Sequence, residues 1–215
     1  MAKPEKKHLF VEGNDDLYAV AQLMGHHVQW GDKKPEWPVV IKAIGSVAEI
    51  LEEEFISTTL TSSTVEILGI MIDADGEFHS RWNAIRRECI ASFPLIPADL
   101  PQDGLVLENA DKKRVGIWIM PDNTSKGMIE TFLAYLVPND QAGMWDRAKN
   151  IVKEVRAAGA PCRECHQDKA NIHTWLAWQD PPGEVFGNAI VQKILDAKSP
   201  HAAQYVAWFK RLYQL

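Results

Sequence analysis

The chain has 215 residues, of which 46% are hydrophobic, and its formal net charge at pH 7 is -6. A chain of this length and composition can bury one sizeable hydrophobic core, so an intrinsically disordered protein is excluded. The acidic balance gives no bulk sign of a nucleic-acid binder, although carboxylates gathered around a divalent cation would be neutralised locally.

Neither a membrane segment nor a disulfide scaffold is expected. No window approaches the roughly 18 apolar residues that a membrane helix needs, and the lysines of MAKPEKKHLF precede no long apolar segment. The three cysteines, Cys89, Cys162 and Cys165, form a sparse and odd set, which argues for reduced thiols. We therefore predict a cytoplasmic protein with no membrane partner.

Short apolar runs alternate with amphipathic segments along the first half of the chain. The runs that predict strands are residues 8–11, 39–44, 65–72, 104–107 and 115–120. The helices predicted between them are residues 14–28, 46–55 and 78–93. This order predicts an α/β fold with a mainly parallel sheet flanked by helices, because parallel strands are joined by right-handed helical crossovers.

The second half of the chain is helical in pattern. The predicted helices are residues 127–137, 139–158, 166–178, 185–196 and 200–213. We expect residues 1–125 to form the α/β core and residues 126–215 to pack on it within the same domain. Trp175, Trp178 and Trp208 fall at helical spacing and are expected in the core, with Trp178 as the alternative lining of a groove.

Carboxylates follow several of the predicted strands at the point where each strand ends. Glu12 follows the first strand, Asp73 and Asp75 follow the third, and Asp122 follows the last. In parallel α/β sheets the ligand site lies outside the carboxyl ends of the strands, so these side chains are expected to converge. Because converging carboxylates repel one another, a divalent cation is the simplest counter-charge.

Each carboxylate also has a purely structural interpretation. Asp73 and Asp75 lie two residues apart, so both can point to one side and hold Mg²⁺; the alternative is a polar loop in which Asp75 caps the next helix. Asp16 lies one helical turn after Glu12 and can face the same way. The alternative for Asp16 is a first-turn charge that interacts with the helix dipole.

The residues VEGNDD after the first strand, followed by an apolar strand ending in DAD, resemble the Toprim (topoisomerase and primase) domain. The spacing of Glu12 and Asp16 is similar to that in nucleases of the OLD (overcoming lysogenization defect) type. The segments IMPDN, GMIE and KANIHTWLAWQDPPG resemble a small bacterial family of Toprim-like proteins. The resemblance implies a Toprim-like, Rossmann-like sheet and nucleic-acid hydrolysis with Mg²⁺ or Mn²⁺, as one ion or two.

The resemblance also implies roles for individual residues. Glu12 acts as a general acid or base or as a metal ligand, while Asp73 and Asp75 hold Mg²⁺. Asp16 contributes to a second metal position. Lys169 matches a lysine that supports the transition state, and its alternative interpretation is a surface lysine.

The sequence departs from the Toprim pattern at the third carboxylate. Glu77 stands where a DxDxD motif has its last aspartate, so it is either a third metal ligand or an exposed residue. Asp122 and Glu130 belong to the pattern of the narrower family. Either can complete a metal shell, and the competing role for both is capping.

The loop sequence PCRECH contains a CxxCH motif. Cys162, Cys165, His166 and His173 supply the ligand types of a structural Zn²⁺ site. The alternatives are haem attachment, which requires export, and a loop that binds no metal.

The leading hypothesis is therefore a metal-dependent nuclease acting on DNA or RNA. The alternative is a Toprim-fold binding or regulatory module that works with a separate ATPase, because OLD-type nucleases usually carry an ATPase domain and this sequence has no GxxxxGK[ST] motif. A third hypothesis is a phosphotransfer or nucleotide-processing enzyme that uses the same carboxylates.

Overall fold

The computed structural model describes residues 6–52 and 54–215, and a five-stranded sheet with the order β2-β1-β3-β5-β4 lies at its centre. The strands are β1 (Lys7–Val11), β2 (Val40–Ala43), β3 (Ile67–Asp73), β4 (Leu105–Glu108) and β5 (Arg114–Met120). β1, β2, β3 and β5 are parallel, and β4 pairs with β5 in the antiparallel sense. The predicted α/β class with a mainly parallel sheet is confirmed.

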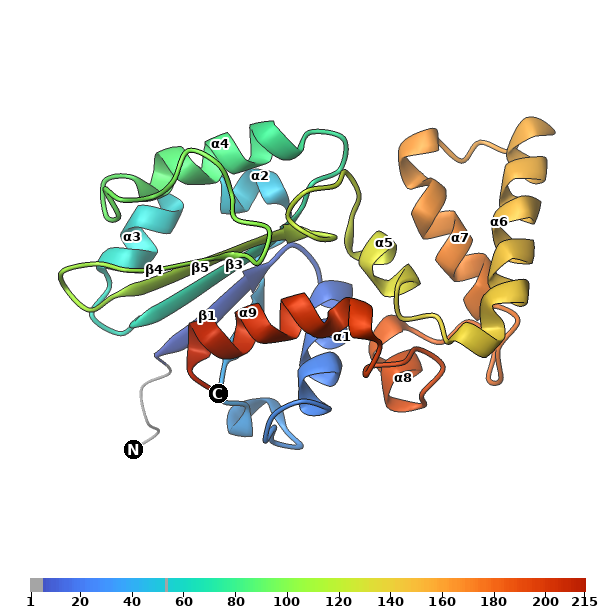
Figure 1. Ribbon diagram of the computed structural model, residues 1–215, viewed down its shortest axis with the longest axis horizontal. Coiled ribbons are helices and arrows are strands. Elements are labelled where there is room, and N and C mark those ends of the chain that lie inside the picture. The colour runs from blue at the N-terminus through green and yellow to red at the C-terminus, as the bar shows by residue number, and fades with distance from the viewer. Residues whose placement is uncertain (1–5, 53) are drawn as a thin grey trace.

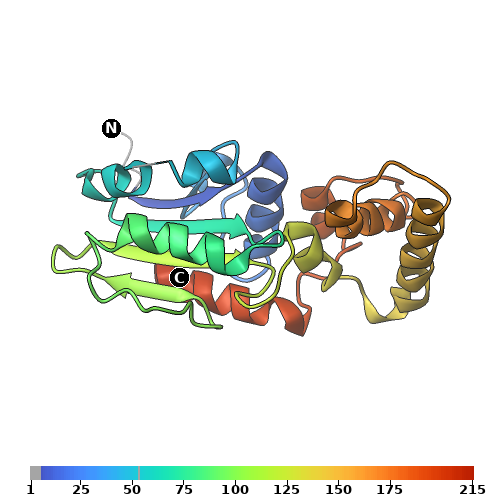
Figure 2. The same ribbon diagram turned by 90° about the horizontal axis from the view of Figure 1, so that it is seen from above.

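Helices cover both faces of the sheet (Figures 1 and 2). The helices are α1 (Asn14–Gly25), α2 (Val47–Ile50), α3 (Phe55–Thr61), α4 (Phe78–Cys89), α5 (Ile129–Ala134), α6 (Ala142–Ala157), α7 (Gln167–Leu176), α8 (Phe186–Val191) and α9 (Ala203–Tyr213), with 3-10 turns η1 (Lys34–Glu36), η2 (Asn139–Gln141), η3 (Glu164–His166) and η4 (Pro200–Ala202). α2, α3 and α4 pack on one face and α1 and α9 on the other, while α6 and α7 form a pair beyond α5.

The composition of β3 explains why it occupies the middle of the sheet. Leu68, Ile70 and Ile72 belong to the core under α4, whereas Ile67 and Met71 belong to the core on the opposite face. A strand covered on both faces has no polar side, so its sequence is a continuous apolar run. The run ends at Asp73, where the strand leaves the core.

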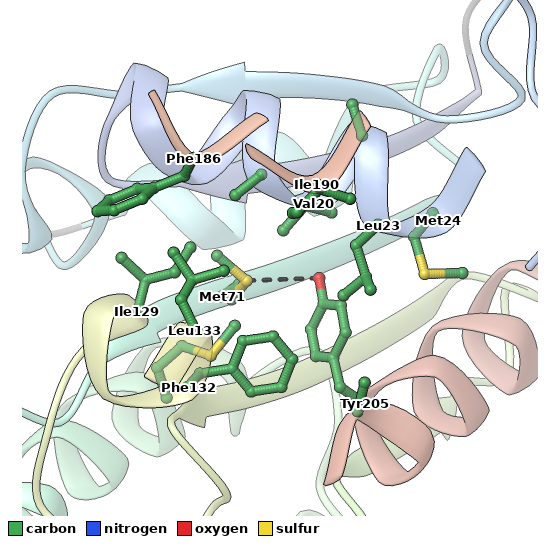
Figure 3. Close-up of a cluster of buried hydrophobic side chains, with 14 of the residues drawn as sticks. Val20, Leu23, Met24, Met71, Ile129, Phe132, Leu133, Phe186, Ile190 and Tyr205 are labelled. Carbon is green, nitrogen blue, oxygen red and sulfur yellow. Dashed lines mark hydrogen bonds between the residues drawn. The ribbon is translucent and has the colours of Figure 1, made fainter. Parts of the chain in front are cut away.

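The C-terminal helix α9 closes the second face of the sheet. The Tyr205 hydroxyl donates to Met71 Sδ at 3.4 Å, and its ring lies among side chains from α1, α5 and α8 (Figure 3). The Tyr213 hydroxyl donates to the His8 carbonyl at 2.7 Å. This helix therefore ties the end of the chain to β1 and β3.

Two paired glycines allow α9 to approach the sheet. Gly69 on β3 lies opposite Gly116 on β5. A Cβ added at Gly69 would stand 2.2 Å from Tyr213 Oη, and one at Gly116 would stand 2.4 Å from Leu212 Cδ2. We expect Gly69→Ala to lower the free energy of unfolding by about 1–3 kcal/mol because α9 must move away. Urea denaturation measures this loss.

Gly143→Ala is the matched control for that substitution. A Cβ at Gly143, in the first turn of α6, would meet nothing within 4 Å. It should leave stability unchanged or raise it slightly, because alanine favours helix. Equal stability of Gly69→Ala and the wild type would contradict the packing argument.

Several predicted helices are interrupted by backbone geometry. The helix predicted over 46–55 is replaced by α2 and α3, and Glu54 before α3 has φ of 65°. The helix predicted over 127–137 begins only at Ile129. Gly127 has φ of 141° and Met128 is extended, so neither residue has helical backbone angles. The one predicted over 185–196 ends at Val191, two residues before Lys193 with its φ of 61°.

Trp175 and Trp208 are fully buried, which confirms their predicted place in the core. The same prediction is wrong for Trp178, which is 39% exposed. Within residues 6–52 and 54–215, no helix combines the length and the apolar character needed to cross a membrane.

Candidate functional site

The first and third strands end side by side, and their carboxylates meet. Glu12 follows β1, and Asp73 is the last residue of β3, the parallel neighbour of β1. Glu12 Oε1 accepts a hydrogen bond from the backbone N–H of Asp73 at 2.8 Å. The two strand ends therefore form one continuous site.

Helix α5 brings a further carboxylate to these strand ends. Asp73 Oδ1 accepts from the N–H of Ile129, the first residue of α5, at 2.9 Å. Glu130 follows and is only 4% exposed. Its Oε1 lies 2.9 Å from Lys169 Nζ on α7, and the lysine side chain is half exposed. The ion pair brings the lysine of the late helix to the site.

Asp16 and Asp75 enter from the two flanking turns. Asp16 is buried in the first turn of α1, where its Oδ2 accepts from the Gly13 N–H at 2.8 Å. Asp75 has φ of 51°, and its backbone exchanges two hydrogen bonds with Gly127 at 2.7 and 2.8 Å. Asp75 Oδ2 lies 2.9 Å from Arg81 Nη2. Asp75 does not cap α4, because Glu77 occupies that position.

Five carboxylates thus form what we call the acidic cluster. Its members are Glu12, Asp16, Asp73, Asp75 and Glu130. Burial, followed by the charges of the other four members, raises the pKa of Asp73 well above its usual value. Asp73 therefore retains its proton far more readily than an exposed aspartate does.

The neighbouring acids respond to the same environment. Burial, with further contributions from Glu12 and Glu130, raises the pKa of Asp16 to about 7, although the Gly13 N–H opposes the shift. Burial and the charge of Asp75 raise the pKa of Glu12. The hydrogen bond to Glu130 raises the pKa of Lys169 and keeps it cationic. Such clustering of perturbed acids is typical of functional sites.

The acidic cluster offers only carboxylate oxygens, the ligand type that Mg²⁺ and Mn²⁺ take. Among the residues that the structure describes, no three His, Cys, Asp or Glu side chains already stand as a metal-ligand set. Glu12, Asp16 and Asp73 each turn one oxygen toward a backbone N–H. Carboxylate oxygens are the hard ligands that these cations prefer. A cation would also relieve the repulsion that raises the pKa values.

Asp122 and Glu77 occupy positions outside this network. Asp122 Oδ1 accepts from the Thr124 N–H and hydroxyl and from the Ser125 N–H, at 3.0, 2.8 and 2.7 Å. Burial alone would raise the pKa of Asp122, but these hydrogen bonds outweigh it and lower the pKa. Asp122 therefore stabilises the turn after β5 and caps no helix, because the N-cap of α5 is Met128. Glu77 is exposed at the start of α4.

The four candidate zinc ligands are not assembled as a site. Cys162 Sγ donates weakly to the carbonyls of Arg163 and His166, while Cys165 is exposed. The His173 ring packs on Phe186, with centroids 5.1 Å apart. In the described part of the chain these side chains belong to no potential metal-ligand group.

Three residues of the site were not predicted from the sequence. Arg81 pairs with Asp75. The Thr131 hydroxyl accepts from the Met128 N–H at 3.1 Å and donates to Asp168 Oδ2 at 2.6 Å, which fixes α7 against the start of α5. Asp168 directly precedes Lys169, and this adjacency is the one sequence signal that could have identified it.

Comparison with known proteins places the chain in a family. Neither the curated proteins nor the solved structures gave a match. A family model described as "Protein of unknown function (DUF3226)" matches residues 6–214, a span that includes the whole acidic cluster and Lys169. The chain therefore belongs to the DUF3226 family.

Proposed function

We propose that this protein hydrolyses phosphodiester bonds in nucleic acid with the help of Mg²⁺ or Mn²⁺. The observation that carries the proposal is the acidic cluster, in which burial and mutual repulsion raise the pKa values of Glu12, Asp16 and Asp73. Burying carboxylates together is unfavourable unless a proton, an ion pair or a metal cation compensates their charge. The resemblance to Toprim domains of the OLD type supports the same assignment, and the proposed location is the cytoplasm.

Each residue of the acidic cluster would have a role in hydrolysis that follows from its position. Asp73 and Asp75 would hold one cation and Asp16 and Glu130 a second, with their remaining oxygens. Bound cations lower the pKa of water and offset charge on the phosphate. Glu12, whose pKa is raised, can hold a proton and deliver it to the leaving oxygen. Lys169 can turn its exposed ammonium from Glu130 to a phosphate oxygen.

One observation favours the alternative, a binding or regulatory module that acts with a separate ATPase. Asp75 is already neutralised by Arg81 at 2.9 Å. An ion pair can replace a metal as the counter-charge in a site that has lost hydrolysis. A module of this kind would retain the fold and bind its partner without cutting nucleic acid.

Titration of the protein with Mg²⁺ and Mn²⁺ by calorimetry, followed by incubation with single-stranded and double-stranded DNA and RNA, tests the proposal. We expect metal-dependent heat and cleavage that EDTA stops. Glu12→Gln should bind metal but cut at least about a hundredfold more slowly, since the amide keeps the bond from the Asp73 N–H but carries no transferable proton. Absence of cleavage by the wild type with every substrate would favour the alternative.

A further inference from the structure

A cleft opens directly beside the acidic cluster. It measures about 440 Å³ and lies between the turn after β3, the loop before α5 and the start of α7. Asp75 belongs to both the cleft and the cluster. The lining of the cleft also includes the side chains of Lys126, Met128, Glu164, Cys165 and Asp168.

The size of the cleft suits one nucleoside and excludes a duplex. Small-molecule sites in proteins typically measure about 300–1,000 Å³, and this cleft lies at the lower end of that range. A base can enter such a space only after it has left the stack of a double helix. The phosphate attached to that base would then lie toward Asp75 and the acidic cluster.

The charges of the lining favour the base over the phosphate. Glu164 and Asp168 contribute two carboxylates that the proposed cation sites do not use, against the ammonium of Lys126. Asp168 Oδ2 already accepts from Thr131, so its second oxygen remains for a ligand. Carboxylates accept hydrogen bonds from exocyclic amino groups, as they do from cytosine N4. Met128 and Cys165 add polarisable atoms that can contact a ring face.

We infer that this cleft holds one unpaired base beside the scissile phosphate and selects bases whose amino group stands at the position of adenine N6 or cytosine N4. The inference rests on the proposed nuclease function and names its substrate: single strands rich in adenine or cytosine. Thymine and uracil present carbonyl oxygens where adenine and cytosine present amino groups, so the carboxylates would repel them.

Single-stranded oligonucleotides of one base test the selectivity. With Mg²⁺ or Mn²⁺, oligo-dA and oligo-dC should be cut about tenfold faster than oligo-dT, the discrimination that one well-placed pair of hydrogen bonds gives. A duplex of dA with dT should be cut more slowly than either favoured single strand. Equal rates for the three single strands would overturn the inference.

The cysteines provide a matched test of location. Cys165 lines the cleft, Cys162 lies outside its lining, and Cys89 is buried. A bulky maleimide on Cys165 in the Cys162→Ser protein should abolish the preference for dA and dC and slow their cleavage. The same label on Cys162 in the Cys165→Ser protein should leave the preference in place. Loss of the preference in both labelled proteins, or in neither, would contradict the assignment.

Failure of the inference and failure of the proposed function give different results. Metal-dependent cleavage without base preference overturns the cleft assignment and leaves the nuclease proposal intact. Absence of cleavage of any nucleic acid overturns the nuclease proposal. Fluorescence anisotropy with the same oligonucleotides then decides the cleft: tighter binding of dA and dC, lost on labelling Cys165, supports it, and equal binding overturns it.

Discussion

Asp73→Asn should stop metal-dependent cleavage, with a loss of at least about a hundredfold, in a protein that remains folded. The asparagine carbonyl can still accept from the Ile129 N–H, so the start of α5 stays in place. The substitution removes the negative charge from the middle of the acidic cluster, where four other carboxylates act on Asp73. Calorimetric metal titration and a cleavage assay measure both consequences, and circular dichroism verifies the fold.

Asp122→Asn is the matched control for Asp73→Asn. It makes the same chemical change after the neighbouring strand β5, but Asp122 binds only within its own turn. Metal binding and cleavage should therefore match the wild type. If Asp73→Asn cut nucleic acid as fast as Asp122→Asn, the acidic cluster would not be the catalytic site.

Asp16→Asn should stabilise the metal-free protein at pH 8 and leave its stability nearly unchanged at pH 4. Folding raises the pKa of Asp16 from 3.8 to about 7, so the folded state binds the proton more tightly. The contribution of protonated Asp16 to folding stability is fully present below about pH 4 and is lost as the pH rises through about 7. At pH 8 the uncharged variant avoids this loss, which is on the order of 4 kcal/mol. Urea denaturation in EDTA at the two pH values measures the difference.

Asp15→Asn controls for the general effect of removing one negative charge from the first turn of α1. Asp15 is the exposed neighbour of buried Asp16. The control should change stability little at either pH, because exposed charges interact weakly. Saturating Mg²⁺ at pH 8 should stabilise the wild type more than Asp16→Asn. If Asp16→Asn were less stable than the wild type at pH 8, the predicted direction of the stability change would be wrong.

The sheet could be predicted from the sequence because its strands are buried on both faces. The apolar run of β3 and the carboxylate at its end are visible as a pattern, and so is the alternation with helices. The direction of β4 could not be predicted. Residues 109–113 join it to β5 as a hairpin, and apolar runs alone do not distinguish a hairpin from a crossover.

The site could be predicted only in part. The meeting of Glu12 with Asp73 follows from adjacent parallel strands. The contact of Glu130 with Lys169 depends on how α7 packs against α5, a tertiary contact that no local pattern encodes. Asp122 shows the opposite difficulty: metal ligation and turn formation use the same residue type at the same kind of strand end, so only the side-chain bonds distinguish them.

The position of α9 has a consequence for biosynthesis. It follows every other described element in the chain, yet Tyr205 and Tyr213 complete the core against β1 and β3, the strands that end in Glu12 and Asp73. Until the ribosome has released α9, α1 covers that face of the nascent sheet only in part, and the remaining apolar side chains are open to chaperones. The strands that end in Glu12 and Asp73 therefore complete their packing only after translation of α9.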